Sequence, residues 1–461
     1  MPTTTQQKRP AVRIRETVDG IPVEELSQAS TVKNTRTSKS SGGDAPAPRP
    51  GDKYIWGIYL LLLLVSVIEL FSASSFEVTS SNVYAPLIRH AIFLAAGLGI
   101  VLVFQRMHYV VFRKWARTFA LVSLILLIIV NVAGVSINGA ERALNVLGFT
   151  IQPPEIAKLA IVLVLAQILA TTQRPRGVSL GGIIGAASVV LIFCGLTFTN
   201  GLTNTILLMS VSLCMFLIGG MEFKKFIIVI AIYIASASMV MIIKSTSSSN
   251  DFRDDVATEQ VENNGIGRQA TWVNRIQRHL AGVSPEDKIT DDNRQTMMAH
   301  FAQAHGGLSG QGPGNSRESS RLPLAFSDYI YSIIVEDTGF IGGACLLMLF
   351  LCLIMRAGRI ASKCSRAFPA LLIMGCAVLI AFQAIVHIAI VVGVAPVSGQ
   401  PLPFISKGGT SILTMSAAIG MMLSVSRYGM NAGSKKQMRD ELKALPEDLQ
   451  AENPTFVGNP V

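Results

Sequence analysis

Residues 329–355 read YIYSIIVEDTGFIGGACLLMLFLCLIM, a continuous apolar run with two adjacent acids, Glu336 and Asp337, near its start. A helix needs about 20 apolar residues to cross a bilayer, so this run is long enough to span one. It follows a long polar segment that ends in the glycine-rich stretch GQGPGNS at 310–316. A glycine-rich turn and acids at the edge of a membrane indicate a site for a molecule that itself lies at the membrane surface.

The whole chain shares this apolar character. Of its 461 residues, 50% are hydrophobic and 15% are charged, whereas soluble proteins average about 25% charged residues. Lipid is therefore the predicted solvent. Backbone groups in lipid must be satisfied within each segment, which makes the apolar runs helices. Barrel strands would alternate apolar and polar residues, and these runs do not. The predicted fold class is an all-α polytopic membrane protein with one large extracytoplasmic loop.

Ten apolar runs are predicted to cross the membrane. Arg and Lys gather in every second short loop between them, as at 113–114, 174–176 and 224–225. Loops of this kind face the cytoplasm, which places both termini there and, by alternation, the long segment 244–327 outside. The predicted spans are 54–72, 87–104, 117–135, 155–171, 179–197, 202–219, 225–243, 329–355, 367–393 and 408–427.

This topology divides the chain into five predicted parts. They are a disordered cytoplasmic tail (1–50), transmembrane helices 1–7 (54–243), the large extracytoplasmic loop (244–327), transmembrane helices 8–10 (328–427) and a cytoplasmic C-terminal tail (428–461). Within the loop, Thr271–Leu280 and Asn293–Ala304 have helical spacing of apolar residues, which predicts two short helices.

The net charge of +10 follows mainly from this topology. Residues 1–53 mix both signs of charge, which does not indicate a nucleic-acid partner, and anionic lipid is the predicted partner of the cations beside the spans. The six cysteines lie in or beside apolar runs, and none falls in the large loop. They are predicted to be packing residues rather than disulfides or zinc ligands.

Ionisable groups within a membrane are costly and by default indicate a functional site. Glu155 and Lys158 begin the span 155–171, directly after two prolines. One interpretation is an ion pair that supports the helix. The other is that Lys158, together with Arg142 of the preceding loop, holds an anionic head group at the outer interface.

The glycine-rich stretch and the helix after it carry further candidate residues. Consecutive backbone N–H groups around Asn315 and Ser316 could cradle a phosphate. Asp328 either belongs to a site or caps the eighth helix. Glu336 lies two turns further on, well within the apolar run, and a capping role does not explain it.

A fourth polar region lies in the ninth span and after it. Gln383 and His387 are four residues apart and share a helix face; a buried His bonded to Gln favours a structural role. The Pro- and Gly-rich segment 399–411, which contains Lys407, is predicted to be irregular backbone that lines a cavity rather than facing lipid.

The large loop contributes three acids, Asp287, Asp291 and Asp292. A carboxylate outside the membrane is suited to act as a general base toward a sugar hydroxyl. The alternative is that these acids are only solvated, as exposed loop acids usually are.

Together these motifs resemble the SEDS family (shape, elongation, division and sporulation). The matches extend from about residue 54 to residue 427 in the order of the family, and the form of 310–316 is more similar to its division members than to its elongation members. The stretches that carry the resemblance are Phe71–Ser74, Gln152–Lys158, Gly310–Ser316, Leu322–Pro323, Ser327–Asp328, Glu336–Gly339 and Gly399–Thr410.

The resemblance implies a peptidoglycan glycosyltransferase that polymerises lipid II during cell division. It implies a class B penicillin-binding protein and other divisome membrane proteins as partners, in the bacterial plasma (inner) membrane at the division septum. The C4 hydroxyl of an acceptor sugar would attack the anomeric carbon of the lipid-linked donor and displace polyprenyl pyrophosphate. Such a reaction needs a base and a set of donors for the departing anion.

The resemblance also assigns roles to individual residues. Asp287 is the predicted base, with Asp291 and Asp292 in reserve, and Arg142 and Lys158 are predicted to bind the pyrophosphate. No cofactor is certain; a divalent cation, Mg²⁺ or Mn²⁺, is left open, and its ligands are unknown. The remaining predicted substrate-binding residues are Glu155, Asn315, Ser316, Asp328, Glu336 and Lys407.

The sequence departs from the family pattern in several places. Asn200–Asn204 replaces a Gln-Pro-Asp-Leu-Gly-Thr motif, and Pro323–Asp328 lacks the usual Glu and His. His387 stands where Asn is common, and Lys407 stands where Tyr is common. Two other functions compete with the polymerase: a lipid II flippase, which would call for repeat symmetry that the sequence does not display, and a divisome scaffold, which leaves the buried ionisable groups unexplained.

Overall fold

The computed structural model describes the residues from 50 to 429 except for several gaps, together with two short strands near the N-terminus. The chain forms two units, residues 1–48 and 49–461. The first contains the antiparallel pair β1 (Thr17–Val18) and β2 (Ile21–Pro22). The described residues are 17–18, 21–22, 50–74, 84–137, 140–146, 149–174, 177–198, 201–236, 238, 279, 288–290, 293–318 and 327–429.

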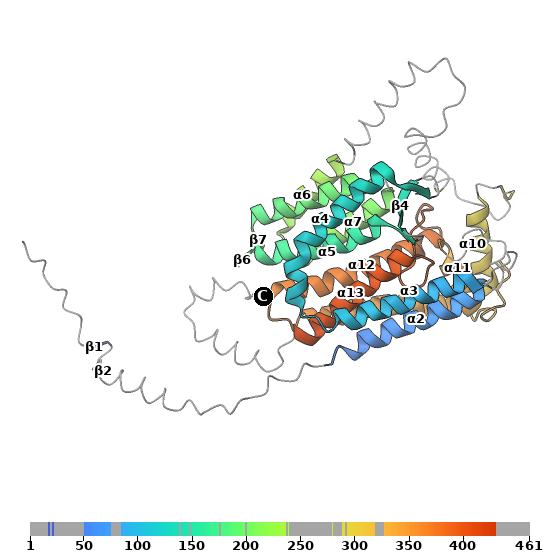
Figure 1. Cartoon of the computed structure of the whole chain (residues 1–461), viewed down its shortest axis with the longest axis horizontal. Coiled ribbons are helices and arrows are strands. Elements are labelled where there is room, and N and C mark those ends of the chain that lie inside the picture. Colours follow the sequence, from blue (N-terminus) through green and yellow to red (C-terminus); the bar gives the residue numbers. More distant parts are fainter. Residues whose placement is uncertain are drawn as a thin grey trace, which may run out of the picture. The chain divides into compact units, whose positions relative to one another are not determined.

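The second unit is a bundle of long apolar helices that run side by side (Figure 1). Among the described residues, 8 helices are long and apolar enough to cross a membrane, and the apolar helix α7 is slightly shorter. Nine of the predicted spans coincide with these helices. The long helices are α2 (Lys53–Ser74), α3 (Tyr84–Phe104), α4 (Tyr109–Ala133), α5 (Pro153–Thr171), α6 (Leu180–Phe198), α7 (Leu202–Ile218), α11 (Ile330–Ala361), α12 (Ala367–Val391) and α13 (Gly409–Tyr428).

The tenth predicted span, 225–243, is helical over residues 223–236, and most of its remainder lies outside the described residues. The count of ten, the placement of both termini and the five-part division therefore remain predictions. In the loop, the predicted helix Asn293–Ala304 is confirmed by α10 (Arg294–Gly306). The predicted helix Thr271–Leu280 lies almost entirely outside the described residues.

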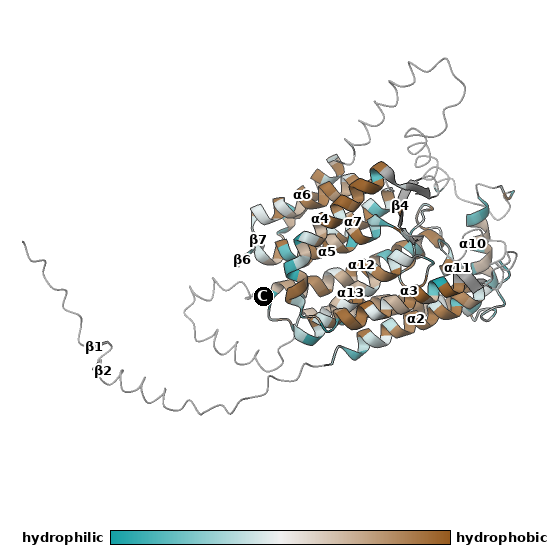
Figure 2. Cartoon of the chain, viewed as in Figure 1, coloured by the Kyte–Doolittle hydropathy of each residue, from teal (hydrophilic) through white to brown (hydrophobic). Residues whose placement is uncertain are grey.

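The helices α5, α12 and α13 form the centre of the bundle. The apolar windows of α5 and α12 are each 72% buried and that of α13 is 83% buried, against 22% for α3. The outer helices α2, α3, α4, α6 and α11 turn much of their apolar surface outward, where Figure 2 shows hydrophobic residues along the ribbons. An apolar outer surface is expected of helices that face lipid, and the buried centre is where a polar site can be sheltered from it.

Short strands join some of the helices, which the sequence analysis did not predict. Between α4 and α5 lies a three-stranded antiparallel sheet, and the hairpin β6 (Gln173–Arg174) and β7 (Gly177–Val178) joins α5 to α6. The sheet lies at the same end of the bundle as α10 (Figure 1). Its strands are β3 (Val135–Ile137), β4 (Ala140–Val146) and β5 (Phe149–Ile151).

The helix α11 is broken at Gly339, whose φ of 75° is outside the helical range. The segment 306–312 lies against this break and supplies hydrogen bonds to it. Phe340 N donates to Gly307 O at 2.9 Å, and Gly312 N donates to Asp337 O at 2.9 Å. A Cβ at Gly306 would lie 2.1 Å from Val335 O, so the close approach requires glycine there. The glycine-rich stretch thus completes the backbone bonding of a broken membrane helix.

At the opposite end of α11, an ion pair ties the helices together. Arg356 Nε donates to both carboxylate oxygens of Asp52, at 3.0 and 3.1 Å, and Asp52 N donates to Ser426 Oγ at 3.0 Å. Burial disfavours the charge of Asp52, but the hydrogen bonds from Arg356 and from the backbone outweigh it and lower the pKa of this carboxyl. The start of α2 is therefore held against α11 and α13.

Candidate functional site

A buried polar network lies where α5, α12 and α13 meet. Pro153 and Pro154 begin α5, which places Glu155 and Lys158 one turn apart on its inner side; both are almost completely buried. Lys158 Nζ donates to Glu155 Oε1 at 2.6 Å and to Gln383 Oε1 of α12 at 2.9 Å. The predicted ion pair is confirmed, and it is part of a wider network rather than an isolated helix pair.

The segment between α12 and α13 closes this network. Gln383 Nε2 donates to Pro401 O at 3.1 Å and to Ser411 Oγ at 3.3 Å. His387 Nδ1 bonds Gln400 O at 2.6 Å rather than the Gln383 side chain. The prediction of irregular backbone over 399–411 is confirmed for residues 399–408, which form turns and bends, but is wrong for residues 409–411, which form the first turn of α13.

Three buried atoms of this network have no hydrogen-bond partner among the residues that the structure describes. They are Glu155 Oε2, His387 Nε2 and Gln400 Oε1. Gln400 Nε2 donates to Asn204 Oδ1 of α7 at 3.0 Å, which fixes the Gln400 side chain while its Oε1 accepts no hydrogen bond among the described residues. Buried polar atoms normally find partners, so these atoms are suited to receive water or substrate hydroxyls.

A second polar cluster lies at the start of α11. Glu336 Oε2 accepts from Ser316 Oγ at 2.5 Å, and Glu336 Oε1 accepts from the backbone N–H groups of Arg317 and Glu318 at 2.8 and 3.3 Å. Glu336 is 0% exposed. These bonds hold the glycine-rich stretch on α11, which gives Glu336 and Ser316 a local structural role.

The suggestion that this stretch cradles a phosphate is not supported. Gln311 N and Gly312 N donate to backbone carbonyls of α11, Gly314 N donates to Ser72 Oγ, and Asn315 N donates to Gly312 O. The donors that a phosphate would need are therefore already engaged within the protein. The side chain of Asn315 is exposed and donates to Gln311 O at 3.1 Å.

The other predicted site residues are less sheltered or lie outside the described residues. Lys407 is exposed, and Asp328 is half-buried. The helix α11 begins after Tyr329, which occupies the capping position, so Asp328 is not the cap residue. Arg142 lies in β4, and its side chain is outside the described residues, as are Asp287, Asp291 and Asp292. Their roles remain predictions.

The helix α10, which follows these three acids, is anchored to the bundle. Gln303 Nε2 donates to Val391 O, one of the last carbonyls of α12, at 2.9 Å, and to Ser332 Oγ of α11 at 3.3 Å. Burial lowers the pKa of His300, which lies one turn earlier against Gly393. Neutral His300 is thus packed at the interface, and the end of the large loop is fixed over α11 and α12.

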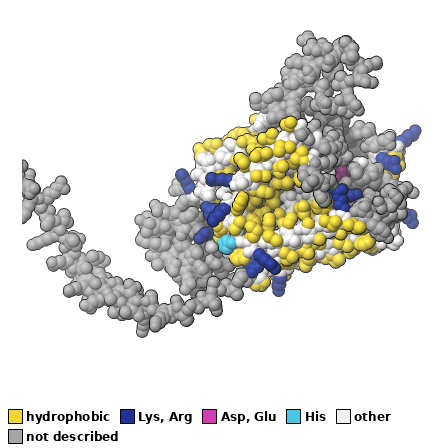
Figure 3. Space-filling model, in the orientation of Figure 1, with side chains coloured by type: hydrophobic (Ala, Val, Ile, Leu, Met, Phe, Trp, Pro, Cys, Tyr) yellow, Lys and Arg dark blue, Asp and Glu magenta, His cyan; other side chains and the backbone are white. Residues whose placement is uncertain are grey.

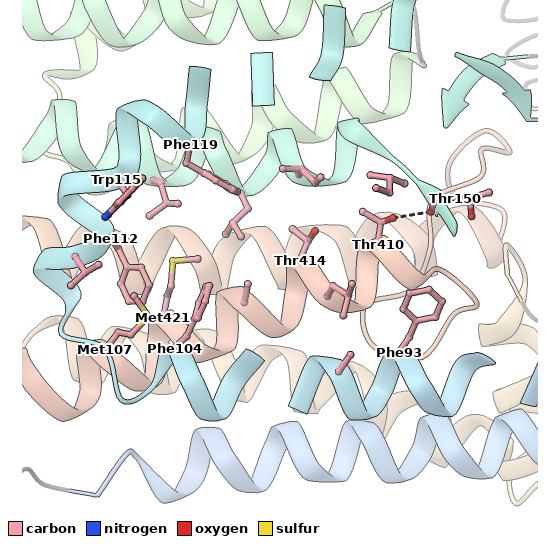
Figure 4. A pocket seen from close by; sticks show the side chains of 18 of the residues that line it. Phe93, Phe104, Met107, Phe112, Trp115, Phe119, Thr150, Thr410, Thr414 and Met421 are labelled. Carbon is pink, nitrogen blue, oxygen red and sulfur yellow. Dashed lines mark hydrogen bonds between the residues drawn. The ribbon is translucent and has the colours of Figure 1, made fainter. Parts of the chain in front are cut away.

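An apolar cavity of about 960 Å³ lies beside the buried network. Figure 3 shows the hydrophobic surface of the molecule hollowed between α4 and α3, and Figure 4 shows the lining side chains. Thr410, whose hydroxyl donates to Thr150 O at 3.2 Å, lies at one end, and Met107 and Trp115 lie at the other. Other lining residues from α3, α4, α5 and α13 are Phe93, Ala96, Phe112, Ile156, Leu159, Leu163 and Ala417.

This cavity was not predicted from the sequence. Its lining residues come from five elements and belong to apolar runs, where each residue looks like an ordinary lipid-facing or packing position. The cavity is connected to the network through Thr410, which lines it: Thr410 Oγ1 accepts from Gln152 N, just before α5, at 3.2 Å, and the next residue, Ser411, accepts from Gln383 Nε2. No group of three or more His, Cys, Asp or Glu side chains could hold a metal ion among the residues that the structure describes.

The fold and the site define a polytopic membrane protein with a sheltered polar network beside an apolar cavity. Residues 52–431 match the family model FTSW_RODA_SPOVE, described as "Cell cycle protein". The chain therefore belongs to this family, the SEDS family that its motifs resemble.

Among curated relatives, a "Probable peptidoglycan glycosyltransferase FtsW" of Trichlorobacter lovleyi is 29% identical over 382 residues, 80% of this chain and 93% of the relative. The "Stage V sporulation protein E" of Bacillus subtilis is 29% identical over 381 residues, 80% of this chain and 95% of the relative. A chain of a solved peptidoglycan synthase complex matches with a TM-score of 0.61 at 20% identity, over 82% of this chain and 98% of that one. At this identity the structural match concerns the fold.

Proposed function

We propose that the protein is a peptidoglycan glycosyltransferase that polymerises lipid II during cell division. The observation that carries the proposal is the junction between the apolar cavity and the buried network of Glu155 and Lys158. A polyprenyl-linked sugar has a long apolar chain joined to an anionic pyrophosphate, so it needs both kinds of surface in contact. Membership of the family and the names of the curated relatives point to the same activity.

The apolar cavity is suited to the polyprenyl chain of the donor or of the growing strand. Its volume of about 960 Å³ lies at the upper end of ordinary small-ligand sites, and an apolar wall binds such a chain without directional contacts. Thr150 and Thr410 lie at one end of the cavity (Figure 4), and Thr410 joins this end to the network because it accepts from Gln152 N and precedes Ser411, which accepts from Gln383. A chain lying in the cavity would therefore bring its pyrophosphate toward Lys158.

The chemistry is a displacement at the anomeric carbon of the donor sugar. The C4 hydroxyl of the acceptor forms the new glycosidic bond, and its proton passes to a base, for which Asp287 is our candidate. The bond between the anomeric carbon and the pyrophosphate oxygen breaks, and polyprenyl pyrophosphate leaves with both electrons. Lys158 and Arg142 would stabilise the charge that develops on this leaving group.

The partner and the location belong to the same proposal. A class B penicillin-binding protein would crosslink the strands that this protein makes, in the bacterial plasma membrane at the septum, with both termini in the cytoplasm. The structural match to a chain from a peptidoglycan synthase complex supports a partner of this kind.

The test is glycan polymerisation from labelled lipid II by the purified protein together with its cognate penicillin-binding protein. Any polymerase activity that the partner itself has is first removed by mutation. Wild type is expected to make polymer, and a folded Asp287→Ala variant is expected to make none. Glu286→Ala, which removes the neighbouring carboxylate, is the matched control and should remain active. Equal polymer from wild type and Asp287→Ala would move the search to Asp291 and Asp292. No polymer from wild type with the partner bound would favour a flippase or a scaffold.

A further inference from the structure

Two carboxyl groups of α2 and α11 face each other inside the bundle, outside the network described above. Glu69 lies in the last turns of α2 and Asp337 in the first turns of α11, and each is only 1% exposed. Ser72, one turn after Glu69, donates a hydrogen bond to Asp337 Oδ2. Residues three apart share a helix face, so Glu69 also points toward Asp337.

Each of these groups has an oxygen without a partner. Glu69 Oε2 and Asp337 Oδ1 are buried and accept no hydrogen bond among the residues that the structure describes. No Lys or Arg in the described part of the chain forms an ion pair with Glu69, Asp337 or the neighbouring Glu336. Glu336 is different because three donors surround its carboxylate, which is the environment of an ionised group.

Buried charges inside a membrane persist only when they are paired, coordinated or neutralised. Glu69 and Asp337 therefore need either protons or a positive charge, and the described side chains supply no positive charge. The two oxygens without partners are hard oxygen ligands, which suit Mg²⁺ or Mn²⁺. Two carboxylates are also enough for Mg²⁺, which usually keeps several water molecules and takes only one or two carboxylates from a protein.

We propose that Glu69 and Asp337 bind a divalent cation, Mg²⁺ or Mn²⁺, beneath the glycine-rich stretch 310–316. Ser72 links the site to that stretch, because its hydroxyl donates to Asp337 and accepts from Gly314 N at 3.0 Å. The cation would thereby hold α2, α11 and the end of the large loop together. From the sequence, a divalent cation was left open without ligands; Asp337 was noted with Glu336 as an acid at the membrane edge, and Glu69 was not predicted to belong to a site.

The test measures Mn²⁺ binding by the purified full-length protein, stripped of metal with a chelator. Free Mn²⁺ is followed by its electron paramagnetic resonance signal, and melting temperature is measured with and without Mn²⁺. Wild type is expected to bind one Mn²⁺ and to melt higher when it is present. Glu69→Gln is expected to bind Mn²⁺ at least about tenfold more weakly, since loss of even an outer partner of a metal site costs about 10–100-fold.

Glu222→Gln is the matched control. It makes the same chemical change at an exposed carboxylate that pairs with Lys225 at 3.0 Å, and it should bind Mn²⁺ as wild type does. Asp337→Asn provides a second variant should Glu69→Gln fail to fold. Equal Mn²⁺ binding by wild type, Glu69→Gln and Asp337→Asn overturns the proposal. So does a wild type that binds no Mn²⁺ at neutral pH, a result that would indicate a proton shared between the two carboxyl groups. These readouts need no lipid II, so they are independent of polymerase activity.

Discussion

Lys158 is the residue at which a structural role and a functional role can be separated. Its ammonium group is buried between Glu155 and Gln383. Removing one member of a buried ion pair leaves the other charge uncompensated, which typically costs about 3–5 kcal/mol. Removing both members together, with side chains of similar volume, is often neutral. If Lys158 only supports the helix, then removing both charges should restore activity together with stability.

We therefore expect Lys158→Met to lower the free energy of unfolding by about 3–5 kcal/mol, and Glu155→Gln combined with Lys158→Met to restore most of it. Polymerisation of lipid II should be lost in both variants, because both lack the Lys158 cation and Arg142 alone leaves part of the pyrophosphate charge unbalanced. Thermal unfolding and the polymerisation assay are compared on the same preparations. Full activity in the stable double variant would show that the pair only supports the fold.

At the residue scale, the sequence predicted the Glu155–Lys158 pair correctly but did not predict the other residues that bond to it. Spacing along one helix is enough to place Lys158 beside Glu155. It does not reveal that Gln383 would bond Lys158 or that His387 would bond a backbone carbonyl, because both contacts depend on how α12 and the segment after it pack. The loop acids were candidates on chemical grounds, but the choice of Asp287 as the base came only through resemblance to a family, since a loop carboxylate has no local signature of catalysis.

At the scale of elements, the glycine-rich stretch 310–316 shows how a local motif can serve a distant helix. Its glycines suggested a ligand-binding turn, but their backbone groups bond to α11 around Gly339. The short strands between α4 and α5 were missed for a different reason. Asn138-Gly139, between the paired strands β3 and β4, is the strongest short-range hairpin signal, but the prediction for this segment rested only on its charged residues.

Gly310→Ala is expected to destabilise the protein by about 1–3 kcal/mol. Gly310 has a φ of 79°, and an added Cβ would lie 2.3 Å from Asp337 O, so the change strains the backbone and pushes the stretch away from α11. Thermal unfolding measures the loss, and limited proteolysis after Gly306 should become faster.

The control for that change is Gly99→Ala in α3, where an added Cβ meets nothing within 4 Å. This variant should be neutral or slightly more stable than wild type, because Ala favours a helix over Gly by about 1 kcal/mol. Equal stability of Gly310→Ala and wild type would contradict the view that the stretch is docked on the break in α11.

At the scale of the whole molecule, hydropathy predicted the spans but not their arrangement. α12 and α2 are both almost entirely apolar sequences, yet α12 is central and α2 is on the outside. Lipid and a packed interior are similarly apolar, so the sequence of a span carries little information on which of them surrounds it. The apolar cavity was missed for the same reason, since it exists only because α3, α4, α5 and α13 leave space between them.

Filling this cavity tests its assignment to the polyprenyl chain. Ala96 lies on the outer side of α3 and lines the cavity, so Ala96→Trp would occupy the space without displacing a buried side chain. We expect the KM for lipid II to rise about tenfold or more, the effect of losing roughly 1.4 kcal/mol of apolar contact, with little change in melting temperature.

Ala95→Trp is the matched control, because Ala95 is the neighbouring exposed residue of α3 and is not part of the cavity wall. It should leave the KM unchanged while adding the same aromatic surface to the outside of the helix. The increase for Ala96→Trp should also shrink when the donor carries a short polyprenyl chain, because such a chain leaves part of the cavity empty. An equal KM for both variants with the full-length donor would mean that the chain lies elsewhere on the protein.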